Sequence, residues 1–350
     1  MSLSAEIGVR LGTLDLDVSL QVAAGEVLAL LGPNGAGKTT VLRALAGLQP
    51  IGRGRIALDD VVLADPDAGR FVHAEDRPIG VVFQDYLLFP HLSVLDNVAF
   101  GPRSRGVTKQ EANASAARWI DRVGLDDMAR VKPAELSGGQ AQRIALARAL
   151  AAEPRLLLMD EPLAALDVAT RATVRRDLRR HLGDFAGCTV LVTHDPLDAL
   201  ALADHVAVVE EGAVTQHGTI AEVTARPRTP YVAELLGVNL LRGRSVGNDV
   251  ALDAGGTVVT ADRIDGAAFV LVRPSSVALH QRRPDTSARN QWMLTIEGID
   301  LLGDRVRLRL VGEVDLVAEV TPAAVLELGL ADGASVWASV KATDVVAFAA

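Results

Sequence analysis

Cysteine and aromatic residues are scarce in this chain of 350 residues, and each scarcity excludes a class of protein. The single cysteine, Cys188, cannot build a disulfide framework within the chain and is typical of a protein kept in a reducing compartment. Aromatic residues make up only 3% and the net charge is −9, so the chain lacks the basic stripe and stacking rings of a nucleic-acid-binding surface. We therefore expect no nucleic-acid partner.

Long hydrophobic runs are also missing, although hydrophobic residues make up 49% of the sequence. No uncharged apolar run approaches the roughly 18–20 residues that span a bilayer. The segment Met1–Glu6 has neither the basic start nor the apolar stretch of a signal peptide. These absences predict a cytoplasmic protein that does not itself cross a membrane.

Lysine is the third rare residue, since only four of the 35 basic residues are lysines. Arginine is the default cation here, so each lysine raises the question of whether its position requires a compact ammonium. Lys109 and Lys132 lie in polar stretches, whereas Lys38 and Lys341 fall within the two motifs described below. Those two lysines are therefore candidate anion ligands.

The hydrophobic pattern changes near residue 237 and predicts two domains, 1–236 and 237–350. In the first, three short apolar runs each precede a helical pattern: Val27–Leu31 before Lys38, Leu156–Met159 before Val168, and Val190–Thr193 before Pro196. Such runs predict an α/β fold with a parallel sheet covered on both faces. In the second, short alternating strands separated by turn residues predict a small all-β, OB-like barrel.

A glycine-rich segment follows the first apolar run and has the P-loop pattern: Gly32, Pro33, Asn34, Gly35, Ala36, Gly37, Lys38 and Thr39, with Thr40 opening the helix. Its backbone amides and the positive end of the helix dipole suit phosphate oxygens. In this pattern Lys38 reaches the β- and γ-phosphates and Thr39 offers its hydroxyl to Mg²⁺. We expect residues 32–40 to bind ATP.

A second apolar run ends in two adjacent carboxylates, Asp160 and Glu161. In P-loop NTPases an Asp at this place holds Mg²⁺. A carboxylate directly after it is placed to take a proton from the attacking water as a general base. We expect Asp160 to be a Mg²⁺ ligand and Glu161 to be catalytic.

The segment Leu136-Ser137-Gly138-Gly139-Gln140 precedes a predicted helix, Arg143–Ala152, and resembles the signature sequence of ABC transporter ATPases. This resemblance extends over roughly residues 3–236. It implies that the signature clamps ATP held by the P-loop of a second cassette through Ser137, Gly138, Gly139 and Gln140. Because the chain has one cassette, the implied working unit is a homodimer with two ATP molecules at its interface.

The same resemblance implies roles for three further residues. Gln84 matches the Q-loop glutamine, which contacts Mg²⁺ and water, and His194 matches the switch histidine, which contacts the γ-phosphate. Asp167 matches the D-loop, which acts on the partner's ATP, although the serine usual in that loop is absent. The aromatic residue on which many such cassettes stack adenine is also missing, so we expect the base to rest on Leu11 or on the stem of Arg10.

The stretch Tyr86–Gly101 directly after Gln84 is rich in apolar residues and resembles that of transport cassettes. In those proteins this region receives a helix of the membrane partner. The resemblance implies a peripheral subunit at the cytoplasmic face of the cell membrane. It also implies two integral membrane permease subunits and an extracytoplasmic substrate-binding protein as partners. A soluble, non-transport ABC ATPase is the distant alternative.

The C-terminal domain carries a second resemblance, over about residues 286–348. Thr286–Trp292 and Val336–Val345 resemble the two ends of the molybdate-binding Mop module, which is related to TOBE domains. In that family the two ends bind a tetrahedral oxyanion at a subunit contact. The resemblance assigns this role to Ser287, Arg289, Lys341, Ala342 and Thr343, and cations with hydroxyl and amide donors suit a dianion.

Together these features predict the ATP-hydrolysing subunit of an ABC importer for molybdate or tungstate, with regulatory molybdate as a possible ligand of its β-domain. Import of sulfate, ferric ion or a polyamine is the alternative, because those ATPases carry related β-domains. The other alternative is that the β-domain keeps the fold of this module without binding an anion.

Overall fold

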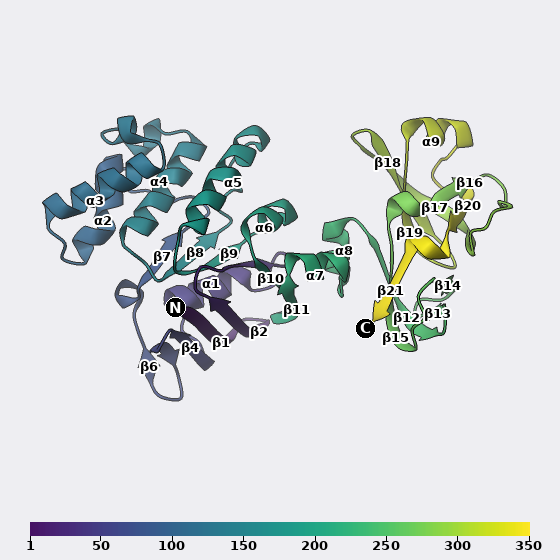
Figure 1. Ribbon diagram of the computed structural model, residues 1–350, viewed down its shortest axis with the longest axis horizontal. Coiled ribbons are helices and arrows are strands. Elements are labelled where there is room, and N and C mark those ends of the chain that lie inside the picture. Colours follow the sequence, from purple (N-terminus) through teal and green to yellow (C-terminus); the bar gives the residue numbers. More distant parts are fainter. The chain divides into compact units, whose positions relative to one another are not determined.

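A computed structural model describes residues 1–350, except for the side chains of Val168 and Ala169. The chain forms two compact units, Met1–Val223 and Thr224–Ala350 (Figure 1). The boundary expected after residue 236 lies inside the second unit, because helix α8 (Pro230–Leu236) packs against strand β12 (Asn239–Val246).

The first unit is built on an eleven-stranded sheet of order β6-β5-β4-β1-β2-β11-β10-β3-β9-β8-β7. Strands β10, β3, β9, β8 and β7 are parallel neighbours, whereas β6, β5, β4, β1 and β2 pair antiparallel. The strands are β1 (Ser2–Leu11), β2 (Leu14–Ala23), β3 (Val27–Leu31), β4 (Arg53–Leu58), β5 (Val61–Asp65), β6 (Arg70–Phe71), β7 (Ile79–Val82), β8 (Leu156–Asp160), β9 (Cys188–Val192), β10 (His205–Glu210) and β11 (Ala213–Thr219).

The parallel part of this sheet confirms the α/β prediction. Strands β3 and β9 are buried along their whole length, which explains their continuous apolar sequences. The antiparallel part was not predicted. Strand β2 alternates buried and exposed residues, so one of its faces packs on the core and the other meets solvent.

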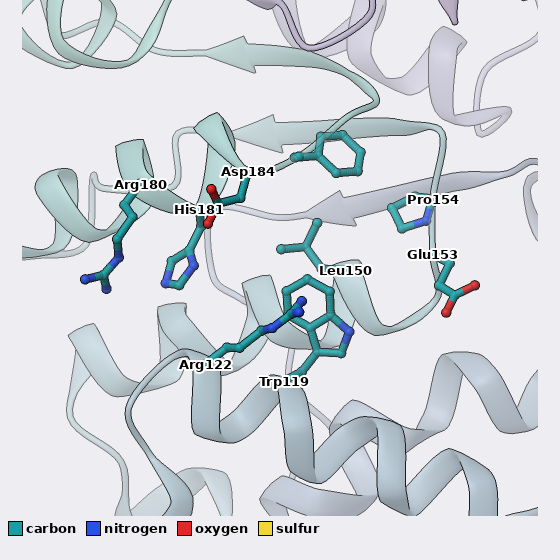
Figure 2. A pocket seen from close by; sticks show the side chains of 9 residues that line it. Trp119, Arg122, Leu150, Glu153, Pro154, Arg180, His181 and Asp184 are labelled. Atoms are coloured by element: carbon teal, nitrogen blue, oxygen red, sulfur yellow. The ribbon is translucent and has the colours of Figure 1, made fainter.

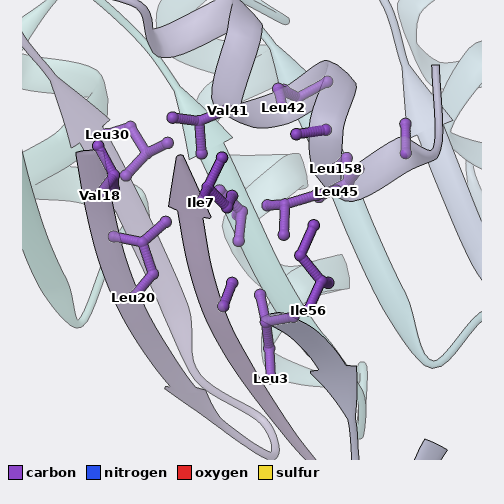
Figure 3. Close-up of a cluster of buried hydrophobic side chains, with 14 of the residues drawn as sticks. Leu3, Ile7, Val18, Leu20, Leu30, Val41, Leu42, Leu45, Ile56 and Leu158 are labelled. Carbon is purple, nitrogen blue, oxygen red and sulfur yellow. The ribbon is translucent and has the colours of Figure 1, made fainter. Parts of the chain in front are cut away.

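Helices cover both faces of the sheet, and β8 shows how the faces are divided. Leu156 and Leu158 belong to the same core cluster as Leu42 and Leu45 of helix α1 (Figure 3). Leu157 and Met159, which alternate with them along β8, pack on the other face, in a cluster with apolar residues of α4 and α5. The helices of this unit are α1 (Lys38–Ala46), α2 (Val94–Ser104), α3 (Lys109–Arg122), α4 (Gly138–Ala151), α5 (Val168–Gly183) and α6 (Pro196–Leu202), with α7 (Ile220–Ala225) at its end and short 3-10 turns at Ala74–Asp76, Asp126–Met128 and Pro133–Glu135.

Helices α2, α3 and α4 form a helical subdomain with its own buried core. Helix α4 starts at Gly138, five residues before the expected start at Arg143. The earlier start follows from a capping box, in which the Ser137 hydroxyl accepts from the Gln140 amide and the Gln140 side chain accepts from the Ser137 amide. The capping box offsets the low helix propensity of the two glycines.

The second unit contains two five-stranded antiparallel sheets, of order β14-β13-β12-β15-β21 and β16-β20-β17-β18-β19, which confirms the all-β prediction. Residues of both sheets form one apolar core. Besides β12 and α8, its elements are β13 (Asp249–Leu252), β14 (Thr257–Val259), β15 (Gly266–Val272), β16 (Ala278–His280), β17 (Asn290–Leu302), β18 (Arg305–Val311), β19 (Leu316–Val320), α9 (Pro322–Leu328), β20 (Ser335–Val340) and β21 (Val345–Ala349), with 3-10 turns at Pro274–Ser276 and Ala342–Asp344.

Among the residues that the structure describes, none of the helices is both long enough and apolar enough to span a bilayer.

Candidate functional site

The P-loop lies between the buried strand β3 and helix α1, and two of its glycines are required by the space around them. A side chain at Gly32 would place its Cβ 2.0 Å from the Val209 carbonyl oxygen. One at Gly37 would lie 2.6 Å from Leu16 Cδ1, and Gly37 has a φ of 105°. Gly37 is also the N-cap of α1 and has no side chain with which to cap it, so the first amides of the helix stay available to an anion.

Lys38 is the buried cation of this loop, with only 7% of its surface exposed. Its ammonium donates to the carbonyl oxygens of Gly32 at 2.7 Å and Pro33 at 2.8 Å. Burial lowers the pKa of Lys38, while the charges of Glu161 and Asp160 act in the opposite direction. The groups that the ammonium contacts at hydrogen-bond distance are neutral carbonyls, so its buried charge is not balanced there. A bound polyanion would stabilise this charge.

The P-loop and Glu161 share one cavity of about 200 Å³, which brings the expected phosphate ligands and the expected base together. Glu161 has left-handed backbone with a φ of 45°, a costly conformation that is typical of functional sites, and its amide donates to the Val192 carbonyl at 2.9 Å. The cavity is lined by Leu14, Asn34, Gly35, Gly37, Lys38, Thr39, Thr40 and Glu161.

His194 and Glu161 face each other across neighbouring strand ends. Nδ1 of His194 lies 3.0 Å from Oε2 of Glu161, and the His194 side chain is 52% exposed. Asp160 precedes Glu161 at the end of β8, and burial, followed by the charge of Glu161, raises the pKa of the Asp160 carboxyl. A cation bound here would stabilise the Asp160 carboxylate against both its burial and its repulsion from Glu161. The Asp160 carboxylate and the Thr39 hydroxyl are oxygen ligands of the kind that Mg²⁺ prefers. The donor set therefore fits Mg²⁺.

The remaining predicted residues lie elsewhere in the first unit. Gln84 is exposed beyond the end of β7. Ser137 and Gly138 are exposed at the start of α4, and Asp167 is exposed at the start of α5, where its carboxylate accepts from the Thr170 amide at 3.0 Å. The exposure of these last three fits the expectation that they act on ATP of a second copy.

Leu14 lines the P-loop cavity but was not named from the sequence, where Leu11 or the stem of Arg10 is expected beside the nucleotide base. Leu14 opens β2 and lines the P-loop cavity, whereas Arg10 pairs with Asp15 at 2.8 Å and Leu11 is 42% exposed. The signal that could have found Leu14 is the short turn after β1, which returns the chain at the register Leu11↔Leu14.

A larger cavity, of about 450 Å³, lies among the C-terminal ends of α3, α4 and α5 (Figure 2). Its walls combine the rings of Trp119 and Phe185 with side chains of both charges. Among its described lining residues, none was expected to bind ATP. The smaller cavity is the candidate site because it joins the P-loop to the ammonium of Lys38 and the carboxylate of Glu161.

In the β-domain, the two halves of the expected oxyanion site flank one end of the β17–β20 ladder. Asn290 pairs with Val340 in register, so Arg289 and Lys341 extend from the same end of these two strands. Ser287, Arg289, Lys341 and Thr343 are exposed and Ala342 is half-buried. Asn290, next to them in the motif, is instead structural, since its side chain exchanges hydrogen bonds of 2.7 and 2.9 Å with the Val259 backbone.

The sequence matches two known families. Residues 16–164 match the ABC transporter family, and residues 286–347 match the TOBE domain. The second match runs from before β17 into β21, nearly the same range as the Mop-like resemblance.

Several curated proteins are similar to the chain over nearly its whole length. The molybdenum import ATP-binding protein ModC of Mycobacterium tuberculosis (strain H37Rv) is 45% identical over 94% of this chain and 93% of its own. The molybdate/tungstate import ATP-binding protein WtpC of Pyrococcus horikoshii is 36% identical over 95% of each. The sulfate/thiosulfate import ATP-binding protein CysA 1 of Chromobacterium violaceum is 41% identical over 95% of this chain and 92% of its own.

Identity at this level over nearly the full length, together with a P-loop that shares its cavity with a carboxylate, establishes the family. The chain belongs to the ABC transporter ATP-binding proteins, with an ATP-binding cassette followed by a C-terminal TOBE domain.

Proposed function

We propose that this chain is the ATP-hydrolysing subunit of an importer for molybdate or tungstate. The observation that carries the hydrolytic part is the shared cavity of Lys38, Thr39 and Glu161. The substrate rests on the full-length similarity to molybdenum and molybdate/tungstate import proteins. Import of sulfate is the second candidate, because the sulfate/thiosulfate relative also covers nearly the whole chain.

The P-loop holds ATP in this proposal, with the amides of residues 32–40 and Lys38 on its phosphates. Thr39, Asp160 and Gln84 would hold Mg²⁺, which neutralises phosphate charge when bound. Gln84 must then move toward the cavity, which its exposed loop allows.

Glu161 acts as the general base. Its carboxylate accepts a proton from the attacking water, and the water oxygen bonds to the γ-phosphorus as the bond to ADP breaks. His194 orients that carboxylate through the 3.0 Å contact and would contact the γ-phosphate.

Two copies of the chain form the working unit. The signature residues Ser137, Gly138, Gly139 and Gln140 act together with Asp167 on ATP held by the other copy. Of these five, Ser137, Gly138 and Asp167 are exposed. Hydrolysis at both sites would reopen the dimer, and this opening and closing supplies the mechanical step of transport.

The loop after Gln84 is proposed to contact the two membrane permease subunits at the cytoplasmic face of the membrane. The structure buries Tyr86 but leaves Leu87 55% and Phe100 45% exposed, so only part of the stretch Tyr86–Gly101 is surface. Arg148 of α4 donates to the Leu87 and Tyr86 carbonyls at 2.7 and 2.8 Å. The signature helix thereby holds the contact loop directly. The extracytoplasmic binding protein acts on the permease from the other side.

Arg289 gives a test of the regulatory oxyanion site. We expect Arg289→Ala in the full-length chain to weaken molybdate binding about tenfold or more, since a charge-assisted hydrogen bond is worth roughly 1.5–3 kcal/mol. Isothermal titration calorimetry measures this, with Arg305→Ala, an exposed arginine of β18, as the matched control. Absence of molybdate binding to the wild-type chain, or equal binding by the Arg289→Ala chain, contradicts the site.

The import function is tested by uptake in cells from which the chain has been deleted. We expect loss of high-affinity molybdate uptake, recovery with the wild-type chain, and no recovery with Glu161→Gln. Unchanged molybdate uptake with lost sulfate uptake would instead favour the second candidate.

A further inference from the structure

Four charged side chains form a cluster beside His194. Asp198 is its centre, with a side chain only 4% exposed. Nη2 of Arg171 lies 2.5 Å from Asp198 and 3.0 Å from Asp195, and Nη2 of Arg175 lies 2.7 Å from Asp198. Two guanidinium groups thus face two carboxylates, the pairing that buried charge requires.

The cluster joins two loops of the candidate site. Arg171 stands one turn into α5, and its amide donates at 2.9 Å to the carbonyl of Asp167, the D-loop residue. Asp195 directly follows His194 and caps α6, since its carboxylate accepts from the Leu197 amide at 2.7 Å. The charge pairs therefore connect the start of α5 to the residue next to His194.

His194 needs such support because its own side chain is half-exposed. With 52% of that side chain in solvent, packing does little to fix the ring, and its position depends on the loop that carries it. The preceding residue, Thr193, is buried and accepts from the Asp195 amide at 3.1 Å. The following residue, Asp195, is held by Arg171.

We propose that Arg171 and Arg175 are positioning residues that hold the His194 loop against Glu161. They do so by clamping Asp195 and Asp198 from the helix that begins at the D-loop. The switch histidine and the D-loop then move as one body when the cassettes close. This inference rests on the proposed roles of Glu161 and His194 in hydrolysis.

The charge distribution agrees with this arrangement. Burial lowers the pKa of Arg171, but the hydrogen bond and charge of Asp198 outweigh it, and the charges of Asp195 and Glu161 add to the rise. Glu161 is therefore close enough to interact with the clamp. An arginine stays charged throughout the physiological range, so the clamp does not open by titration.

Asp195→Asn in the full-length chain is the most selective test. Asparagine keeps the α6 cap, because it caps helices as well as aspartate does, but it loses the ion pair to Arg171. We expect kcat for ATP hydrolysis to fall about ten- to a hundredfold, the effect of a small misplacement of a catalytic group. The KM for ATP should stay within about twofold, because the P-loop is untouched.

Arg171→Gln supplies a second variant, with Arg176→Gln, an exposed neighbour on α5, as the control that leaves kcat unchanged. The double variant Arg171→Gln with Asp195→Asn should have about the kcat of the less active single variant, because both substitutions break the same clamp. The proposal is overturned if the losses of kcat in the two single variants add in the double variant, or if Asp195→Asn has the wild-type kcat. It is also overturned if kcat falls only in proportion to thermal stability. If Arg171→Gln does not fold, Asp195→Asn decides alone. Glu161→Gln separates the two claims: if it still hydrolyses ATP, the proposed hydrolytic site itself is wrong.

Discussion

Replacing Glu161 with glutamine is expected to stop ATP turnover while ATP stays bound. Glutamine has nearly the shape of glutamate and keeps a group near His194, but it cannot accept the proton of the attacking water. General-base catalysis contributes about 10²–10⁴-fold, so we expect kcat to fall by at least about a hundredfold. The P-loop ligands are unchanged, so the affinity for ATP should stay within a few-fold. Single-turnover hydrolysis and equilibrium ATP binding measure the two quantities separately.

Glu153→Gln is the matched control for this experiment. Glu153 is an exposed glutamate with a left-handed φ of 50°, close to the 45° of Glu161, but it lines the other cavity. Its replacement should leave kcat unchanged. Because the variant at Glu161 retains ATP, it should also accumulate as the ATP-bound dimer in size-exclusion chromatography. Undiminished hydrolysis by Glu161→Gln would remove Glu161 as the base.

Arg77→Met is expected to produce a large loss of stability. Arg77 is 1% exposed and donates to the carbonyls of Ala44 at 2.9 Å and Leu45 at 2.6 Å, at the end of the P-loop helix. It also donates to the carbonyls of Val72 and Leu63. Burial lowers its pKa to about 10, so it still carries its charge at neutral pH and favours the negative end of the helix dipole.

Methionine fills a similar space but removes the Arg77 donor from the carbonyls of Leu45 and Val72, whereas the carbonyls of Ala44 and Leu63 keep the backbone amides of Gly47 and Val72. Each unsatisfied carbonyl costs about 1–3 kcal/mol, and part of this is offset because methionine buries no charge. We therefore expect the free energy of unfolding to fall by roughly 2–4 kcal/mol. That corresponds to a fall in Tm of roughly 5–15 °C, measured by differential scanning calorimetry. Arg10→Met is the control, because Arg10 is 75% exposed in its pair with Asp15 and should change stability by less than about 0.5 kcal/mol. An unchanged Tm in Arg77→Met would show that the carbonyls find other donors.

Sequence reasoning succeeded where the pattern is local. The strand before the P-loop, the loop itself and the carboxylates after β8 are short continuous segments, and the phosphate-binding geometry follows from the glycines within them. The buried strands β3 and β9 were predicted because burial on both faces demands unbroken apolar sequence. The TOBE match over residues 286–347 likewise falls on a segment recognised from its two ends.

It failed where contacts join distant segments. Strand β1 pairs with the distant strand β4, and β2 joins the rest of the sheet through the still more distant β11, so nothing local shows that these strands extend the parallel sheet. The apolar stretch after Gln84 was assigned from its resemblance to the region that receives a helix of the membrane partner, but the helical subdomain buries Val94 and Val98 in it. The roles of Arg77, Arg171 and Asp198 depend on partners that sequence spacing does not reveal, and these buried charges were missed for that reason.

The most direct test of the proposed function is ATP hydrolysis by the chain reconstituted with its two permease subunits and the binding protein in lipid vesicles. Molybdate, tungstate or sulfate is supplied at equal concentration only on the side of the binding protein. The proposal predicts that molybdate and tungstate stimulate hydrolysis, that sulfate does not, and that Glu161→Gln abolishes the response. Stimulation by sulfate without any response to molybdate would contradict it.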